Sequence, residues 1–175
     1  SFSGASPVTI TQSSFTGTAG HGLLVNALTG AGCPLILTDV EADCTGTFDG
    51  LNIQTTGSSV TVTDSAVVSD TGNAARLMTL AGVAATVTGL SAVSRTAQGV
   101  QLTDITASSA ITITSAVASS STATGIAASN IANSDVVVDG YTISAGANGA
   151  IVDGVSGTGS FAAAQSTFTA TAGGT

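Results

Sequence analysis

The chain has 175 residues, of which 7% are charged, and two basic residues against ten acidic ones give a net charge of -8. So few cations cannot neutralise the phosphates of a nucleic acid or the headgroups of an anionic membrane surface. A hydrophobic content of 43% argues against a disordered chain, and the longest uncharged stretch is too rich in Ser, Thr and Asn to predict a membrane span. The length predicts a single domain.

Short segments of alternating β-branched residues recur from residue 8 onward. The second residue of each falls at positions 9, 36, 61, 86, 112 and 137, and these positions differ by 27, 25, 25, 26 and 25. A weaker copy is expected at 162–165, which places Ala163 after Val137 in this series. Alternation with a period of two residues predicts a β-strand in each segment.

Two further strand candidates follow each of these segments. The second lies a few residues on, as at Phe15-Thr16, and the third follows a glycine-marked turn, as at 22–25 and 50–53. No window shows a helical period of 3.6 residues, and a three-strand repeat cannot bury its apolar face unless it stacks on a neighbour. The sequence therefore predicts an all-β, single-domain parallel β-helix, or β-solenoid, of three short strands per coil.

A repeat of about 25 residues, a length typical of solenoids, predicts roughly six and a half coils. The expected divisions are a leader at 1–6, six full coils over 7–161 and a partial coil over 162–175. One side of the first and third strands should face the interior. The predicted inward residues are Val8, Ile10, Leu35, Leu37, Val60, Val62, Val87, Ile111, Ile113, Val136 and Val138 in the first strand, and Leu23, Val25, Leu51, Ile53, Leu77, Val100, Leu102 and Ile126 in the third.

This repeat length and rhythm, from residue 7 to the end of the chain, resemble the right-handed parallel β-helix proteins, of which pectate-lyase-like solenoids are an example. That group includes polysaccharide lyases, phage tailspikes, autotransporter passengers, and repeat-built adhesins and surface-layer or sheath proteins. The resemblance implies a right-handed coil. In character the chain is most similar to the extracellular adhesin, surface-layer and sheath proteins.

The residues expected of a polysaccharide-cleaving enzyme are missing from the sequence, which has no lysine and only two arginines. Arg95 follows Asp70 by one repeat length, so the two should form an ion pair between stacked coils. Arg76 has no carboxylate at the same coil position and is expected on a solvated face. His21 lies between two glycines, where a role in the turn is expected rather than catalysis or zinc binding. We predict no catalytic residues.

Two small clusters leave alternatives open. Asp39, Glu41 and Asp43 should share one face of a strand, either as a solvated acidic patch or as oxygen ligands for Ca²⁺, and we expect no other cofactor. Cys33 and Cys44 are the only cysteines, and they are either paired in a disulfide or two buried free thiols.

The outward positions of the first strand form two columns that consist mostly of threonine, with Ile36 in the first, and we call them the threonine ladder. Three interpretations are open: solvent-facing strand positions with high β-propensity, a lateral packing surface for self-assembly, or an ice-binding grid similar to that of β-solenoid antifreeze proteins. The threonines are Thr9, Thr11, Thr38, Thr61, Thr63, Thr86, Thr88, Thr112 and Thr114, and the predicted columns continue through Val137 and Ala163, and through Asp139 and Gln165.

Solenoid ends expose unpaired strand edges unless they are capped, and the sequence shows no amphipathic capping helix at either end. Two alternatives are open: the chain is cut from a longer array, or molecules stack end to end. Residues 1–6 and 162–175 together approach the length of one coil, which is the length that a joint between stacked molecules needs. We therefore expect a non-enzymatic structural protein that self-associates end to end or laterally into a surface layer, sheath, fibre or adhesin stalk.

The first residue, Ser1, is not Met, so we expect the chain to be a processed or an excised segment. We expect the protein to be secreted and to lie outside the cell or on its surface. An ice-binding protein is the first alternative, and a carbohydrate-binding or carbohydrate-degrading β-helix is the second. The expected partners are accordingly further copies of the chain, a cell-surface polysaccharide or an ice surface.

Overall fold

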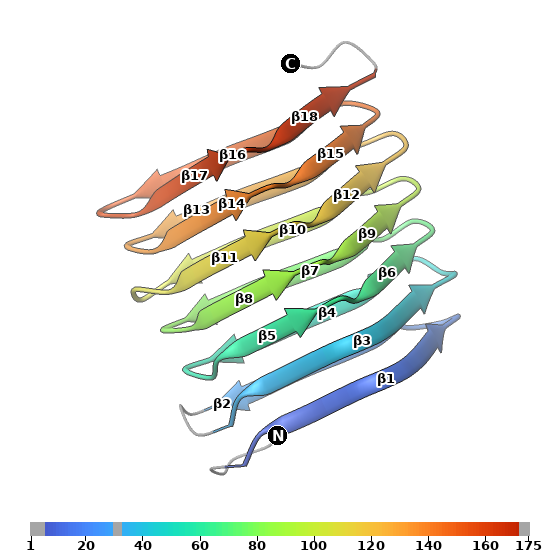
Figure 1. Ribbon diagram of the computed structural model, residues 1–175, viewed down its shortest axis with the longest axis horizontal. Coiled ribbons are helices and arrows are strands. Elements are labelled where there is room, and N and C mark those ends of the chain that lie inside the picture. The colour runs from blue at the N-terminus through green and yellow to red at the C-terminus, as the bar shows by residue number, and fades with distance from the viewer. Residues whose placement is uncertain (1–5, 30–32, 172–175) are drawn as a thin grey trace.

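The computed structural model describes residues 6–29 and 33–171, and within these ranges every regular element is a β-strand. The chain winds upward from the N-terminal to the C-terminal end in stacked turns (Figure 1). No helix long and apolar enough to cross a membrane occurs in the described part of the chain.

The strands form three columns. The first column contains β5 (Val60–Thr63), β8 (Ala84–Thr88), β11 (Ala110–Thr114), β14 (Asp135–Asp139) and β17 (Ser160–Ala164). The second contains β6 (Ala66–Ser69), β9 (Ser91–Ser94), β12 (Val117–Ser120), β15 (Thr142–Ala145) and β18 (Thr167–Ala170). The third contains β2 (Leu23–Thr29), β4 (Leu51–Thr56), β7 (Ala75–Ala81), β10 (Val100–Thr106), β13 (Ile126–Ala132) and β16 (Ala150–Ser156). Two longer strands, β1 (Val8–Gly17) and β3 (Leu35–Cys44), each span the first and second columns.

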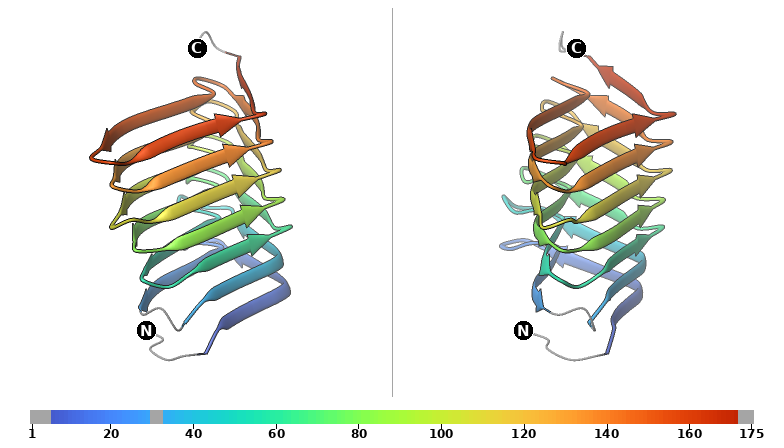
Figure 2. Two further views of the ribbon diagram at one scale, coloured as in Figure 1. Left: turned by 60° about the vertical axis from the view of Figure 1, so that its left-hand side comes forward. Right: turned by 90° about the vertical axis from the view of Figure 1, so that its left-hand side faces the viewer.

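All strand pairs are parallel, and each strand pairs with the equivalent strand of the next coil. β3 pairs with β5 through its first half and with β6 through its second half, so the first two columns form one 12-stranded sheet. The third column forms a separate six-stranded sheet. Figure 2 shows the coils stacked between the two ends. The predicted all-β parallel solenoid, with one repeat period in each coil, is confirmed.

Left-handed backbone residues bend the chain between the first and second columns. Their φ values lie between 47° and 67°, a region that glycine, asparagine and aspartate enter at the lowest cost. One such residue occurs in every coil, which explains the small polar residues that separate the predicted strands. This corner column consists of Gln12, Asp39, Asp64, Gly89, Ser115, Gly140 and Gln165.

The interior is a narrow aliphatic stack in which equivalent residues of successive coils lie in contact. Leu35, Val60 and Ala85 are register partners and all are buried, and Ile53, Leu77 and Leu102 form a similar column in the third sheet. The predicted inward residues of the middle coils are confirmed as buried. Those of the first coil are only partly buried, because none of the described residues forms a coil below them: Val8, Ile10, Leu23 and Val25.

Tyr141 is the largest fully buried side chain. Its hydroxyl has no hydrogen-bond partner, and burial raises the pKa of this phenol above its usual range. The ring lies inside the corner between β14 and β15, in the column position that Ala116 occupies one coil below. This tyrosine therefore fills the core near the C-terminal end of the solenoid.

Buried serines close the turns that follow the second column. The hydroxyl of Ser94 donates to the carbonyl of Gly72 at 2.8 Å and accepts the N–H of Ala97 at 2.9 Å. Ser69 and Ser120 make the same pair of hydrogen bonds one coil below and one coil above. Because each hydroxyl satisfies one backbone donor and one acceptor, the turn can be buried without orphan polar groups.

Candidate functional site

The threonine ladder forms on the solvent side of the first column in the predicted register. Thr61, Thr86 and Thr112 are successive partners in one column, and Thr63, Thr88 and Thr114 lie beside them in the other. The hydroxyls of Thr88 and Thr114 are 3.0 Å apart and hydrogen-bond to each other. The ladder is therefore regular through the middle of the molecule, where strand spacing is about 4.8 Å.

The ladder prediction is wrong in the last coil by one residue. Val137 pairs with Ala162 and Asp139 with Ala164, whereas Ala163 and Gln165 were expected at these positions. The last coil thus begins one position earlier than expected, and Gln165 lies in the corner column. A run of three alanines cannot reveal which of its members face inward, so the sequence left this register undetermined.

The acidic residues near β3 lie around an open groove of about 420 Å³ at the corner of the lower coils. Asp39 and Glu41 line it together with Asp64 of the next coil, while Asp43 does not. Within the described ranges, no three His, Cys, Asp or Glu side chains lie close enough together to hold a metal ion. The two alternatives, a solvated acidic patch and a calcium site, both stay predictions.

The disulfide alternative is wrong, because Cys33 and Cys44 are free and both are buried. Strand β3, with its bend at Asp39, lies between the two cysteines. Cys44 is the partner of Ser69 in the column of turn-closing serines, and its thiol points to the carbonyl of Gly20 at 3.3 Å. It therefore closes the first turn as serine does above it.

The ion pair between Arg95 and Asp70 is confirmed. Nη1 of Arg95 lies 2.7 Å from Oδ1 of Asp70, and both side chains are accessible to water. An exposed pair of this kind contributes at most about 1 kcal/mol.

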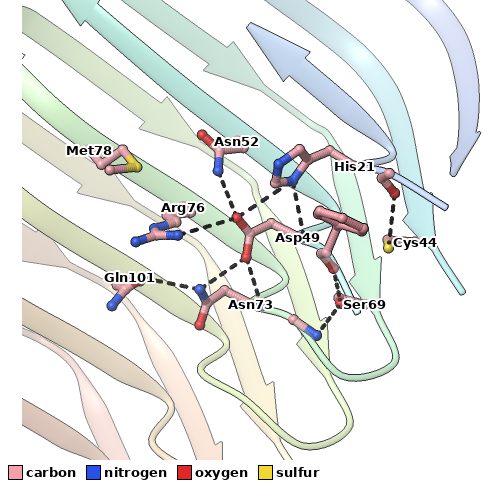
Figure 3. Close-up of polar contacts among 12 residues, drawn as sticks. His21, Cys44, Asp49, Asn52, Ser69, Asn73, Arg76, Met78 and Gln101 are labelled. Atoms are coloured by element: carbon pink, nitrogen blue, oxygen red, sulfur yellow. Dashed lines mark hydrogen bonds and ion pairs between the residues drawn. The ribbon is translucent and has the colours of Figure 1, made fainter. Parts of the chain in front are cut away.

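A cluster of polar side chains surrounds Asp49 at the turn that leads into the third column (Figure 3). Its carboxylate is only 6% exposed, and it accepts hydrogen bonds from Asn52 Nδ2 at 2.7 Å and from the N–H and Nδ2 of Asn73, both at 3.0 Å. His21 accepts the N–H of Asp49 at 3.1 Å through Nδ1 and packs edge-on against Phe48. We call these residues, together with Arg76, the Asp49 cluster.

Arg76 has no carboxylate at its own coil position, as expected, because its register partners are Asn52 and Gln101, but its side chain is only partly exposed and lies near Asp49. Its Nη1 lies 3.9 Å from Oδ2 of Asp49, and its Nε is buried without a hydrogen-bond partner. The sequence signal that could have revealed the cluster is the polar residue two places before each third-column strand. In the lower coils this residue is His21, Asp49 or Asn73, and Gln98 follows one coil higher.

The hydrogen bonds of the Asp49 cluster link the turns of successive coils to one another. The side chain of each member accepts the backbone N–H of its equivalent in the next coil: His21 from Asp49, Asp49 from Asn73, and Asn73 from Gln98. Both carboxylate oxygens of Asp49 are occupied by protein donors, and no second carboxylate appears among the side chains of the cluster. The arrangement therefore stabilises the turns, which supports the turn role expected for His21.

The two ends of the solenoid are open in the described residues. Strands β16, β17 and β18 at one end, and β1 and β2 at the other, each pair with one neighbouring coil only. Val152 is 40% exposed, whereas its partner Ala128 one coil below is buried, and Phe168 is 37% exposed above buried Ile143. These inward positions present apolar surface at the C-terminal end.

Comparisons with protein-family models, with curated proteins and with solved structures find no match to this chain.

Proposed function

We propose that this chain is a non-enzymatic structural protein that self-assembles end to end. The observation that supports the proposal is the pair of open coil ends, where strands with unpaired edges coincide with exposed apolar side chains. Four of the nine large apolar side chains exposed in the described ranges lie in β16 and β18. Unpaired edges and apolar patches of this kind favour association with a further chain.

Lateral packing through the threonine ladder is the second contact of the proposed assembly. The ladder carries no charged residue from Thr9 to Thr114, so two such faces can approach without repulsion. We place the protein outside the cell or on its surface, in a layer, sheath, fibre or adhesin stalk. The lack of lysine supports this location, because it leaves trypsin-like proteases few sites to cut.

Two matched variants test the end-to-end proposal by sedimentation velocity. Phe168→Lys places a charge at the open end, whereas Val117→Lys places the same charge on an exposed residue of the central strand β12. We expect the first variant to lose most of its concentration-dependent association, keeping only the lateral contact, and the second to associate like the wild-type protein. A wild-type protein that sediments as a monomer at high concentration contradicts the proposal.

Ice binding is a second candidate function, favoured by the in-register ladder of the central coils. A regular uncharged grid of hydroxyls and methyls can order water where a charged face cannot. Thermal hysteresis at millimolar protein tests it, with Thr88→Lys in the ladder and Thr142→Lys on an exposed position of the second column as control. Activity lost only in the ladder variant supports ice binding, and its absence from the wild-type protein removes this candidate. Carbohydrate binding has less support, because the only tyrosine, Tyr141, is buried.

A further inference from the structure

The two end coils share a sequence that none of the coils between them has. Residues 12–16 read Gln-Ser-Ser-Phe-Thr, and residues 165–169 read Gln-Ser-Thr-Phe-Thr. Gln12 and Gln165 occupy the same corner column, where the intervening coils have Asp, Gly or Ser. Phe15 and Phe168 occupy the same inward column, where the intervening coils have Ala42, Val67, Ala92, Ala118 and Ile143.

Charge is also distributed so that the end coils hold almost no carboxylates: none lies in the described residues before β3, and Asp153 in β16 is the only one in the end strands β16, β17 and β18. All ten acidic residues lie between Asp39 and Asp153, although the chain carries a net charge of -8. A contact between the two ends therefore brings no side-chain carboxylates together. Like charges placed directly opposite each other on neighbouring strands would destabilise such a contact.

The free strand edges at the two ends are compatible in direction. Among the described residues, β1 pairs only with β3 above it, and β17 and β18 pair only with β14 and β15 below them. The two edges lie at opposite ends of the stack (Figure 2). When a second copy is placed head to tail, its β1 lies next to β17 and β18 of the first copy. The strands then run parallel, as β1 and β3 do within one molecule.

We propose that β1 of one copy pairs with β17 and β18 of another, in the register that places Gln12 beside Gln165 and Phe15 beside Phe168. This inference rests on the proposed end-to-end assembly and specifies its partner and its register. The pairing extends over the ten residues of β1, and it places Val8 beside Phe161 at the start of the strand.

In this register, like residues stack as they do inside the molecule. The two glutamines form an amide ladder and the two phenylalanines stack with an offset, both of which are favourable in stacked parallel strands. The serines continue a hydrogen bond already present in the fold: the N–H of Tyr141 donates to Ser166 Oγ at 3.2 Å, and that of Val40 to Ser65 Oγ at 3.2 Å. At the joint, the N–H of Ser166 donates to Ser13 Oγ of the next copy.

Disulfide cross-linking tests the register. Thr16 and Thr169 are exposed and occupy the same column, so across the joint their Cα atoms lie about 4.8 Å apart, within reach of a disulfide. We expect Thr16→Cys/Thr169→Cys, treated with a mild oxidant, to give a ladder of covalent multimers on a non-reducing gel that reductant removes. Native Cys33 and Cys44 do not interfere, because both are buried.

The matched control is Thr9→Cys/Thr169→Cys, in which the first cysteine lies seven residues away along β1, a distance of roughly 23 Å. It should cross-link at least tenfold less. Thr169→Cys alone should give no more than traces of dimer, whereas tail-to-tail contact would give abundant dimer. A second matched pair, Gln12→Cys/Gln165→Cys, repeats the test at the corner column.

The outcomes separate the inference from the proposed function. If the wild-type protein assembles but the matched pairs cross-link no better than the control, the register is wrong and end-to-end assembly stands. If the wild-type protein does not assemble, both the register and the proposed function are wrong.

Discussion

Replacing Asp49 with alanine should destabilise the protein more than removing any exposed carboxylate. The substitution leaves three N–H groups without an acceptor, one on Asn52 and two on Asn73. Each unsatisfied buried donor costs about 1–3 kcal/mol, and the partly exposed Arg76 and His21 beside them let water replace some of the loss. We therefore expect the lower end of the range, a total of about 3 kcal/mol.

Urea denaturation followed by circular dichroism measures this loss as a shift of the midpoint. Asp70→Ala is the matched control, because it also removes one carboxylate, but that carboxylate forms an exposed ion pair with Arg95. This variant should lower the free energy of unfolding by at most about 1 kcal/mol. Hydrogen exchange should show the added opening in the coils that contain β4 and β7. If the Asp49 and Asp70 variants have the same midpoint, the reasoning that the Asp49 cluster holds the turns together is refuted.

Three further predictions rest on individual side chains of the fold. Burial raises the pKa of Tyr141, so its phenol should stay protonated in the folded protein at pH values above the usual phenol pKa of about 10. The free energy of unfolding should fall as the pH rises beyond about 10, because the unfolded protein then loses the proton that the folded protein keeps. Absorbance at 295 nm, compared between folded and unfolded protein, checks the protonation state, and a phenolate signal near pH 10 in the folded protein contradicts the prediction. Cys33 and Cys44 should be unreactive towards a thiol reagent until the protein is unfolded, when both react; rapid labelling of the native protein would show that the thiols are not buried. Arg95→Ala should lower stability by at most about 1 kcal/mol, and the difference should vanish in 1 M salt, whereas a loss that persists there would mean that the side chain contributes packing.

The fold could be predicted from the sequence because every coil repeats the same alternation at nearly the same spacing. Val60, Val62 and Val87 face inward as their period requires, and the polar residues between the strands are those that bend the chain. The register of the last coil could not be predicted in this way, because Ala162, Ala163 and Ala164 are identical and do not distinguish the inward face of the strand from the outward face.

The Asp49 cluster could not be predicted in the same way, because its contacts cross coils at irregular separations. The loop between β3 and β4 has six residues, whereas the equivalent loop between β6 and β7 has five. This extra residue changes the spacing around Asp49, so a fixed repeat period does not place Asp49 beside His21 or Arg76. The ion pair of Asp70 with Arg95 was predictable because both residues lie where the period holds.

The match between the two ends depends on the register of the last coil. With Ala163 taken as the partner of Val137, Gln165 falls in the threonine ladder and its likeness to Gln12 is hidden. The observed pairing of Val137 with Ala162 brings Gln165 into the corner column. Phe168 then aligns with Phe15, and the shared sequence of the end coils becomes visible.

Electron microscopy of the wild-type protein at high concentration, with light scattering on the same sample, tests the central claim most directly. End-to-end assembly predicts filaments, either one solenoid wide or bundled through the threonine ladder, and a scattering mass that rises with concentration. A monomeric scattering mass at every concentration, with no filaments on the grid, would contradict it.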